Sequence, residues 1–279
     1  MSELRITFLG TSSGRPTPRR GVASVFLQYG AESVLFDCGE GTQLQALKAS
    51  VRPSRLRAIC ISHYHGDHVN GLPGFLGTLG LNGHREKMVI AAPRGLDRYL
   101  SVLRDLSILH PAFEVEHVLN SAGEVFRTPD FAITTCKLDH RIPTYAFLFK
   151  EHDLTGRFDL DRARELGVPA GPLFGQLQRG NAVTLADGRV VQPSEVLGPT
   201  RRGRSIAYVT DTRPTPAAAE LARGADILIH EATYLHELRE QAVERKHATV
   251  REAAIVAADA GVKRLILTHI SPKHTSTRA

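Results

Sequence analysis

One short stretch holds three histidines and one aspartate within six positions, directly after an apolar run. The run spans residues 56–61, and it is followed by His63, His65, Asp67 and His68. Neutral imidazole and carboxylate groups are the ligands that zinc and similar divalent ions prefer. The stretch therefore predicts a strand that ends in a metal-binding loop. Only a fold that brings further ligands to the same place can complete such a site.

The spacing of these residues suits two ions better than one. In an extended segment, residues two positions apart point the same way, so His63 and His65 can bind one ion. Gly66 then permits a sharp turn, after which Asp67 and His68 can face a second ion. Two metal ions about 3.5–4 Å apart are the arrangement that cleaves phosphate esters. The alternative is a solvated loop rich in histidine, and ligands on distant strands would exclude it.

The composition is that of a soluble globular protein. Of the 279 residues, 42% are hydrophobic and 23% are charged, and the longest apolar runs have the length of a strand. We therefore expect a sizeable core and no membrane-spanning segment. The N-terminus leads straight into a strand-like run, without the pattern of a signal peptide, and the three cysteines are widely spaced. These features predict a cytoplasmic protein without disulfide bonds.

The net charge of the chain favours a polyanionic partner. Its 35 basic and 29 acidic residues give a formal charge of +6 at pH 7. Arg15, Arg19 and Arg20 lie in one early loop, and three more arginines lie within residues 201–204. Such a surplus indicates binding to a polyanion if the clusters share one face. Taken singly, each cluster is also compatible with ordinary solvated arginines.

The hydrophobic pattern predicts two series of strands and helices with a different segment between them. In the first half we expect strands at 4–9, 22–29, 33–37, 56–62 and 88–92 and helices near 69–81 and 94–106. In the second half we expect strands at 205–210, 226–229 and 263–268 and helices near 215–222, 236–246 and 250–260. Residues 113–150 have the pattern of short antiparallel strands. Residues 151–200, rich in glycine, proline and charge, predict a projecting insertion.

Polar residues follow the carboxyl ends of several predicted strands. Asp211, His230–Glu231 and His269 each end a strand of the second half, and His140 follows the apolar run 131–138. Because α/β folds assemble their sites at the carboxyl ends of strands, these residues can meet the histidine-rich loop at one edge. Seven residues then suffice for two ions. We expect His63, His65 and His140 on one ion, Asp67, His68 and His269 on the other, and Asp211 between them.

Further stretches make the whole chain resemble a known family. They are Phe8–Gly14, Phe36–Gln43, Gly171–Phe174, His230–Thr233 and His247–Thr249. With the metal motif, they resemble the ribonuclease Z family of the metallo-β-lactamase superfamily, endonucleases that trim the 3′ trailer from precursor tRNA. The resemblance implies an α/β (α+β) fold, a four-layer αββα sandwich in which residues 1–279 form a single domain. It also implies two zinc ions per subunit and a homodimer.

The same resemblance assigns the insertion to substrate binding. In the family, an inserted arm grips the tRNA, and residues 151–200 occupy its place. Gly171 and Pro172 match the family within this segment. The early loop with Arg15, Thr17, Arg19 and Arg20 resembles the loop that receives the CCA end of tRNA. These six residues, Arg15, Thr17, Arg19, Arg20, Gly171 and Pro172, are the predicted substrate-binding residues.

Roles in catalysis follow for individual residues. Two bound cations would produce a bridging hydroxide that attacks the scissile phosphorus, and Asp67 would orient or deprotonate it. The leaving ribose 3′ oxygen needs a proton, and we expect His247, oriented by Glu231, to supply it. The products would be a 3′-hydroxyl on the tRNA and a 5′-phosphate on the trailer. Asp37 is expected to hydrogen-bond a ligand loop rather than to bind metal.

The chain departs from the family pattern in two places. Gly21 stands where asparagine is usual in the early loop, which bears on CCA discrimination more than on cleavage. At the other end, His269–His274 differs from the usual motif and the chain stops where relatives continue. We therefore expect a C-terminal segment that is short relative to relatives.

Two other functions stay open from the sequence. The first is a hydrolase of small esters on the same fold, such as a phosphodiesterase or an arylsulfatase-like enzyme. The second is a non-catalytic RNA-binding subunit, although the complete ligand set argues against it. The native metal is also open, because the same ligand types bind manganese or iron. The exact cleavage position, the response to CCA and the true oligomeric state are open as well.

Overall fold

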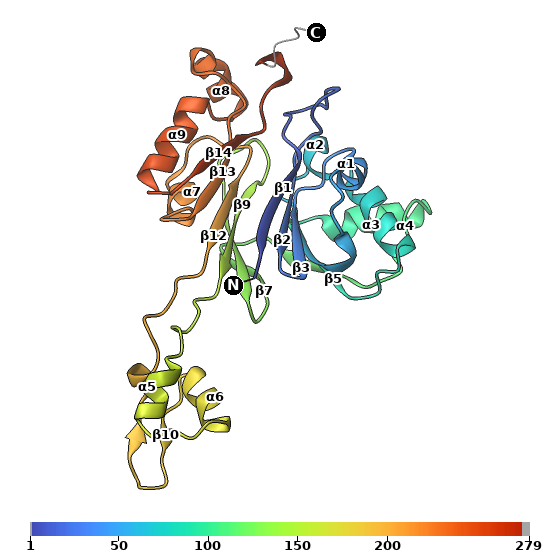
Figure 1. Ribbon diagram of the computed structural model, residues 1–279. Coiled ribbons are helices and arrows are strands. Elements are labelled where there is room, and N and C mark those ends of the chain that lie inside the picture. Colours follow the sequence, from blue (N-terminus) through green and yellow to red (C-terminus); the bar gives the residue numbers. More distant parts are fainter. Residues whose placement is uncertain (1, 275–279) are drawn as a thin grey trace. The chain divides into compact units, whose positions relative to one another are not determined.

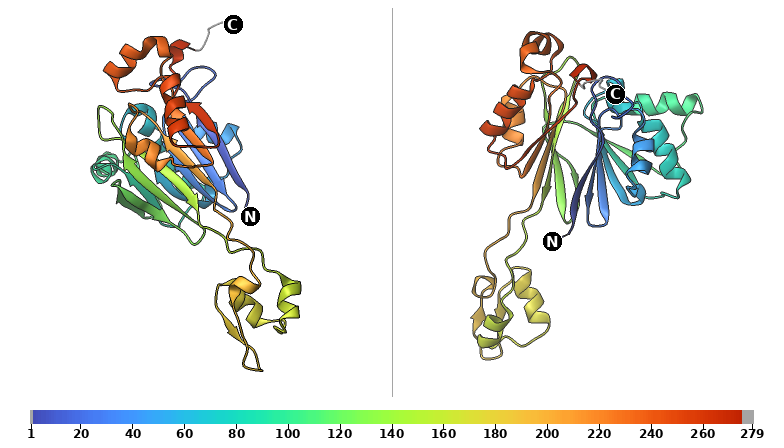
Figure 2. Two further views of the ribbon diagram at one scale, coloured as in Figure 1. Left: turned by 90° about the vertical axis from the view of Figure 1, so that its left-hand side faces the viewer. Right: turned by 45° about the horizontal axis from the view of Figure 1, so that its top comes forward.

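The computed structural model describes residues 2–274, which divide into two compact units. The main unit comprises the described residues up to Phe149 and from Ser205 onward, and the second unit is Lys150–Arg204. In the main unit two β-sheets pack face to face, with helices on the outer face of each (Figure 1). The right-hand view of Figure 2 shows the same order of layers, and the left-hand view looks onto the faces of the sheets. This four-layer arrangement confirms the αββα sandwich.

The first sheet has six strands and is mixed, with antiparallel pairs at one side and parallel pairs at the other. Its order follows the chain: β1 (Leu4–Gly10), β2 (Ser24–Tyr29), β3 (Glu32–Phe36), β4 (Leu56–Cys60), β5 (Met88–Ala92) and β6 (Val115–Leu119). The pairs β1–β2 and β2–β3 are antiparallel, whereas β3–β4, β4–β5 and β5–β6 are parallel. The expectation of an antiparallel series over residues 113–150 is therefore wrong for β6. Its five residues, two of them polar, are compatible with a strand but do not identify its partner, which is the parallel strand β5.

The second sheet collects strands from the later part of the chain. Its order is β14 (Leu265–Thr268), β13 (Ile227–Glu231), β12 (Ser205–Val209), β9 (Tyr145–Glu151), β8 (Phe131–Lys137) and β7 (Gly123–Arg127). The strands β12, β13 and β14 are parallel, so their carboxyl ends lie at the same edge of the sheet. That edge is where Asp211, Glu231 and His269 emerge.

The layers are held by apolar side chains on both faces of the sheets. Between the sheets, Phe36 stacks on Tyr208 with ring centroids 5.6 Å apart and lies 5.9 Å from Phe147. Within β12, Ile206 and Tyr208 join this inner core, whereas Ala207 and Val209 pack against the outer helices. Successive side chains of a strand point to opposite faces, and a strand covered on both faces is apolar throughout.

Helices cover the outer faces of both sheets. The first sheet carries α1 (Thr42–Lys48), α3 (Leu72–Leu81) and α4 (Leu96–Asp105), and the second carries α7 (Pro216–Leu221) and α9 (Val250–Asp259), whereas α8 (Arg239–Arg245) lies beyond the end of the second sheet (Figure 1). The predicted helix over 69–81 is in fact two, because α2 (Gly66–Val69) ends before α3 begins. At the start of α9, the side chain of Thr249 accepts from the Glu252 backbone N–H and the side chain of Glu252 accepts from the Thr249 backbone N–H, which forms a capping box. None of the helices within residues 2–274 is long and apolar enough to cross a membrane.

The second unit has a small core of its own. It contains α5 (Leu160–Glu165), α6 (Pro172–Gln178), β10 (Val183–Thr184) and β11 (Val190–Val191). Its buried apolar residues, among them Leu177 and Val191, contact each other as a separate cluster. A short 3-10 turn of this unit lies at Pro193–Glu195, and three others lie in the main unit at Pro53–Arg55, His236–Leu238 and Pro272–His274. Residues 275–279, where the sequence predicts a shortened C-terminal segment, lie outside the described residues.

Candidate metal centre

The predicted ligand side chains converge at the edge of the sandwich where the parallel strands end. Three overlapping groups form there, and in each group the ligand atoms lie within 4.8 Å of one another; the third, Asp211, His247 and His269, shares Asp211 with the first group and His269 with the second. The first group is His63, His65, His140 and Asp211, and the second is Asp67, His68 and His269. The ligands come from loops after strands of both sheets, so the fold places residues from distant parts of the chain side by side.

Asp211 lies between the two groups and presents one oxygen to each. Its Oδ2 lies 3.5 Å from Nε2 of His63 and 3.6 Å from Nε2 of His140. Its Oδ1 lies 3.3 Å from Nε2 of His68 and 3.1 Å from Nε2 of His269. A carboxylate in this position can serve one cation with each oxygen.

The protonation behaviour of the first group suits metal binding. Burial lowers the pKa of His63 to about 4, and the nearby charge of His68 acts in the same direction. Burial also lowers the pKa of His65 and His140. Imidazole binds a metal in its neutral form, so these three rings are available as ligands near neutral pH.

The carboxylates and His68 carry opposite charge close together. Burial raises the pKa of Asp211, but the charges of His269 and His68 outweigh it and hold that pKa well below its usual range. Burial lowers the pKa of His68, but the carboxylates of Asp211 and Asp37 outweigh it and raise that pKa. Without a metal ion, a proton on His68 supplies the positive charge beside these carboxylates, and a bound cation would replace it. Five imidazoles and two carboxylates, without a thiolate, make a donor set that fits zinc or a similar ion.

Asp37 supports the ligands from behind. It is fully buried, and its carboxylate accepts hydrogen bonds from the Ser62 backbone N–H at 2.7 Å, the Ser62 hydroxyl at 2.9 Å and the Tyr208 hydroxyl at 2.8 Å. It also lies 2.8 Å from Nδ1 of His68, while the other nitrogen of that ring faces Asp211. Its place fits the supporting role that the sequence predicts, because such partners fix the orientation of a ligand.

Several strand ends adopt a backbone conformation that side chains disfavour. Asp37, Asp211 and His269 have φ values of 54°, 28° and 55°, all in the left-handed region. Non-glycine residues with positive φ are uncommon, and they cluster at functional sites where surrounding contacts hold them. Here each of the three turns a polar side chain into the site directly after a strand or near its end.

A second charged pair lies beside the ligand groups. Nδ1 of His247 lies 3.0 Å from Oε1 of Glu231 and 4.0 Å from Asp211. Burial lowers the pKa of His247, but the carboxylate of Glu231 outweighs it and raises that pKa. Glu231 itself accepts hydrogen bonds from the Thr212 backbone N–H at 2.8 Å and the Thr233 hydroxyl at 2.6 Å. The ring of His247 is thus held through Nδ1, and within residues 2–274 its Nε2 makes no hydrogen bond.

Both ligand groups also receive hydrogen bonds that the sequence did not reveal. The Thr233 hydroxyl lies 2.9 Å from Nδ1 of His269, and the Ser62 hydroxyl lies 2.9 Å from Nδ1 of His63. The Gly14 backbone N–H donates to Oδ2 of Asp67 at 2.7 Å. The only signal for Ser62 and Thr233 is that they neighbour predicted functional residues. That position alone does not separate a supporting hydroxyl from an ordinary one.

A cleft of about 450 Å³ opens over this centre, and much of its lining is basic. It is lined by Ser13, Gly14, Arg15, His65, His140, Arg141, Thr233, Tyr234, Arg245, His247, Ser271, Pro272 and Lys273. Of the predicted substrate-binding residues in the early loop, Arg15 alone lines this cleft. Arg19 and Arg20 are exposed on a turn whose backbone N–H groups both donate to the hydroxyl of Thr17. Gly171 and Pro172 lie in the second unit, at the start of α6.

The chain matches known families and proteins over nearly its whole length. A family model described as the metallo-beta-lactamase superfamily matches residues 17–171, and one described as a beta-lactamase superfamily domain matches residues 178–270. Ribonuclease Z of Acaryochloris marina is 46% identical over 278 residues, 99% of this chain and 88% of the relative. Ribonuclease Z of Gloeothece citriformis is 46% identical over 97% of this chain and 86% of the relative. The crystal structure of human tRNase Z, short form, superposes with a TM-score of 0.71 at 28% identity and covers 99% of this chain and 95% of that chain.

Proposed function

Since this chain belongs to the ribonuclease Z family of the metallo-β-lactamase superfamily, we propose how its own residues carry out cleavage of precursor tRNA. The chain is an endoribonuclease that processes the 3′ end of tRNA. Identity of 46% over nearly the full chain favours this activity over the hydrolysis of small esters and over a non-catalytic role. The observation that carries the proposed mechanism is the carboxylate of Asp211, which faces one ligand group with each oxygen.

Two zinc ions per chain are the proposed cofactors. His63, His65 and His140 would hold one ion, Asp67, His68 and His269 the other, and Asp211 both. When bound, the ions supply a water of lowered pKa and offset negative charge on the phosphoryl oxygens. The donor set also accepts manganese or iron, so metal analysis of the purified protein decides the native ion.

Asp67 and His247 are the proposed catalytic side chains on either side of the scissile phosphate. Burial raises the pKa of Asp67, but the hydrogen bond with His269 and the charge of His68 outweigh it and keep that pKa below its usual value. An ionised Asp67, held by the N–H of Gly14, orients the attacking water. His247, held through Nδ1 by Glu231, presents Nε2 to the leaving 3′ oxygen and donates the proton.

The direct test maps the cut in a labelled substrate. Zinc-loaded protein is incubated with 5′-labelled precursor tRNA, and the labelled product is sized and its end chemistry determined. We expect a single product that ends in a 3′-hydroxyl next to the discriminator nucleotide, and no product after treatment with a chelator. A 2′,3′-cyclic phosphate would contradict the proposed water attack, and an unprocessed substrate would contradict the assignment as a whole.

The second unit is proposed to bind the body of the tRNA. Four of its arginines pair with carboxylates within the unit, whereas Arg157, Arg179 and Arg201 make no ion pair within residues 2–274. The unit can be removed cleanly, because Leu154 and Arg201 are hydrogen-bonded to each other at its base. Replacing residues 155–195 by a short glycine-serine linker should abolish cleavage of precursor tRNA and spare hydrolysis of bis(p-nitrophenyl) phosphate. Unchanged tRNA cleavage would contradict a binding role.

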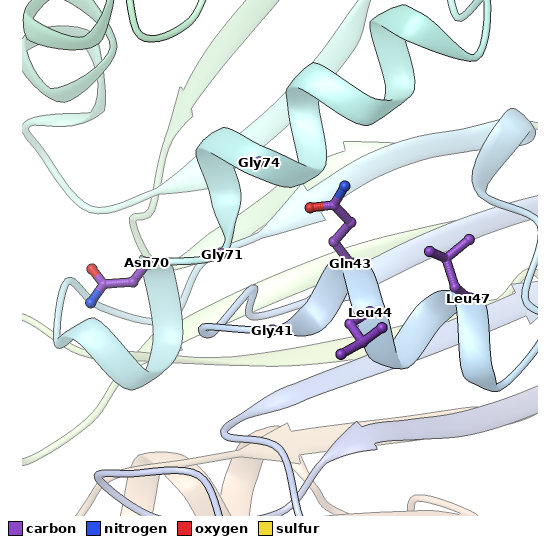
Figure 3. Close-up of a pocket in the computed structure, with 7 residues that line it drawn as sticks. All are labelled: Gly41, Gln43, Leu44, Leu47, Asn70, Gly71 and Gly74. Atoms are coloured by element: carbon purple, nitrogen blue, oxygen red, sulfur yellow. The ribbon is translucent and has the colours of Figure 1, made fainter.

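A homodimer is proposed through the outer face of α1. Leu44 and Leu47 are 53% and 67% exposed, and they border a groove between α1 and α3 that is lined by uncharged residues (Figure 3). In a chain with a net charge of +6, an uncharged groove is a place where two copies can meet with little repulsion. Light scattering should show a dimer for the wild type and a monomer for Leu47→Glu. The matched control is Ile255→Glu, on the exposed side of α9, which should stay dimeric.

A cytoplasmic location is part of the same proposal. Precursor tRNA is made inside the cell, and the thiols of Cys38, Cys60 and Cys136 are all free, which suits a reducing compartment. Cell fractionation with an antibody to the protein would test it. Recovery in a secreted fraction would contradict this location.

A further inference from the structure

We propose that Arg213 is a positioning residue, which holds His247 where its ring can protonate the leaving oxygen. The inference rests on the proposed role of His247 as general acid. Arg213 lies two positions after Asp211, in the loop that follows β12, and its side chain is 14% exposed. It does not line the cleft over the metal centre, so it acts through other residues rather than on the substrate.

The guanidinium of Arg213 grips the backbone of His247 itself. Its Nη1 donates to the carbonyl oxygen of His247 and, at 3.0 Å, to Oε2 of Glu252. Its Nη2 donates to Oε1 of the same glutamate. One planar group thus joins the main chain at His247 to a carboxylate on α9: Nη1 contacts both acceptors, and Nη2 adds a second hydrogen bond to the carboxylate.

Glu252 fixes the other end of the short segment that runs from His247 to Thr249. Its Oε2 accepts a hydrogen bond from the Thr249 backbone N–H at 2.9 Å, as part of the capping box of α9. The segment from His247 to Thr249 is therefore tied at its first carbonyl by Arg213 and at its last N–H by Glu252. With both ends fixed, the ring of His247 is left little freedom to swing away from Glu231.

The same loop also fixes the partner of His247. The Thr212 backbone N–H donates to Glu231, and the Arg213 backbone N–H donates to the Asp139 carbonyl at 2.9 Å. Three consecutive residues, Asp211, Thr212 and Arg213, thus face the ligand groups, the orienting carboxylate and the backbone of the general acid. This loop sets the distance between the ligand groups and the proton donor.

Arg239 provides a matched control for the charge of Arg213. Its Nε lies 3.3 Å from Oε1 of Glu252, but its side chain is 60% exposed and, within residues 2–274, makes no hydrogen bond to His247. Arg239→Gln removes a cation from the same carboxylate and leaves the His247 carbonyl held. Any effect particular to Arg213 must therefore come from that second contact or from its more buried pairing.

The test compares two substrates whose leaving groups differ in their need for a proton. The ribose 3′ oxygen of precursor tRNA needs protonation, whereas p-nitrophenolate leaves bis(p-nitrophenyl) phosphate without it. For Arg213→Gln we expect kcat on precursor tRNA to fall about 100-fold with KM unchanged, since misplacing a catalytic group by about 1 Å has that effect. The Arg213→Gln protein should hydrolyse bis(p-nitrophenyl) phosphate at the wild-type rate and keep its metal content. The Arg239→Gln protein should show wild-type activity on both substrates.

Two further variants separate positioning from simple support of the fold. Arg213→Lys keeps a cation beside Glu252, but its side chain ends one bond short of the Nη1 position and does not hold the His247 carbonyl in the same way. Compared with Arg213→Gln, it should restore the melting temperature and not kcat. The double variant Arg213→Gln/His247→Ala should be no slower on precursor tRNA than His247→Ala alone. Amide hydrogen exchange at residues 247–249 should be faster in Arg213→Gln.

Each contrary result has a distinct meaning. Equal losses on both substrates, or lost metal, would overturn the inference, because Arg213 would then be supporting Asp211. Additive losses in the double variant would also overturn it. If the wild type leaves precursor tRNA uncut, the proposed function fails. If His247→Ala leaves cleavage intact, the general acid is misassigned, and the hydrogen-exchange result at residues 247–249 still reports on the contact.

Discussion

The carboxylate of Asp37 lies 2.8 Å from Nδ1 of His68, while Nε2 of the same ring lies 3.3 Å from Asp211. Asp37 thus fixes which way the ring faces and raises its basicity as a ligand. We expect Asp37→Asn to weaken zinc binding about 10–100-fold, the usual effect of losing such a partner. Chelator competition measures this affinity. Tyr208→Phe, which removes a single hydrogen bond to the same carboxylate, should have a smaller effect.

Removing ligands should show how the ions are shared. Because Asp211 faces both groups, Asp211→Ala should lower the zinc content at both positions. His140 faces the first group alone, so His140→Ala should leave about one ion per chain, given the usual three or four ligands of a zinc site. Metal content is measured by mass spectrometry after exhaustive dialysis. Equal losses in the two variants would mean that Asp211 does not bridge.

His247→Ala should separate catalysis from metal binding. The ring is held by Glu231 and lies 4.0 Å from Asp211, farther than any of the four histidines that face that carboxylate. We expect kcat on precursor tRNA to fall about 10²–10⁴-fold, the usual contribution of a general acid. Zinc content and tRNA affinity, measured by filter binding, should stay nearly intact. A parallel loss of metal would place His247 among the ligands instead.

The interface between the two sheets should dominate the stability of the main unit. Phe147 is fully buried there against Phe36. Phe147→Ala should lower the free energy of unfolding by about 3–5 kcal/mol, because it removes a large apolar side chain and leaves a cavity. Urea denaturation measures it. Leu81→Ala, at a position that is 90% exposed, is the control and should change stability by less than about 0.5 kcal/mol.

Glu252 should make stability depend on pH on the acid side. Burial raises its pKa, but hydrogen bonds from Arg213 and Thr249 outweigh it and hold the pKa below the ordinary 4.5. A carboxylate with a depressed pKa stabilises the fold fully above its unfolded value, and this stability is lost as the pH falls toward its folded value. The difference in melting temperature between wild type and Glu252→Gln should therefore shrink below about pH 4.5. A constant difference down to pH 3 would show that the charge of Glu252 contributes nothing.

The ligand candidates could be predicted because strand ends leave a mark in the sequence. His140, Asp211 and His269 each follow an apolar run, and parallel strands bring such ends to one edge. The sandwich is expected from the resemblance to a known family and not from any local pattern. The spacing of Thr249 and Glu252 marks the capping box of α9 in the same local way as the strand ends. These signals depend only on neighbours along the chain, which a single sequence displays.

Other features depend on contacts that no local pattern records. The parallel pairing of β6 with β5 was mispredicted, because a five-residue strand of mixed polarity suits either sheet. The hold of Arg213 on His247 joins residues 34 positions apart through a carbonyl oxygen, which every residue possesses. The exposure of Leu44 and Leu47 could not be predicted from the sequence either. Spacing along a helix shows which residues share a face but not whether another element covers that face.

The left-handed backbone at Asp37, Asp211 and His269 costs the fold conformational stability at the metal centre. Glycine would adopt these conformations at lower conformational cost, yet it would bring neither a ligand nor a hydrogen bond. Any lineage that improves the heat resistance of this fold must therefore find its substitutions elsewhere. The strand ends are positions where selection for chemistry has overridden selection for stability.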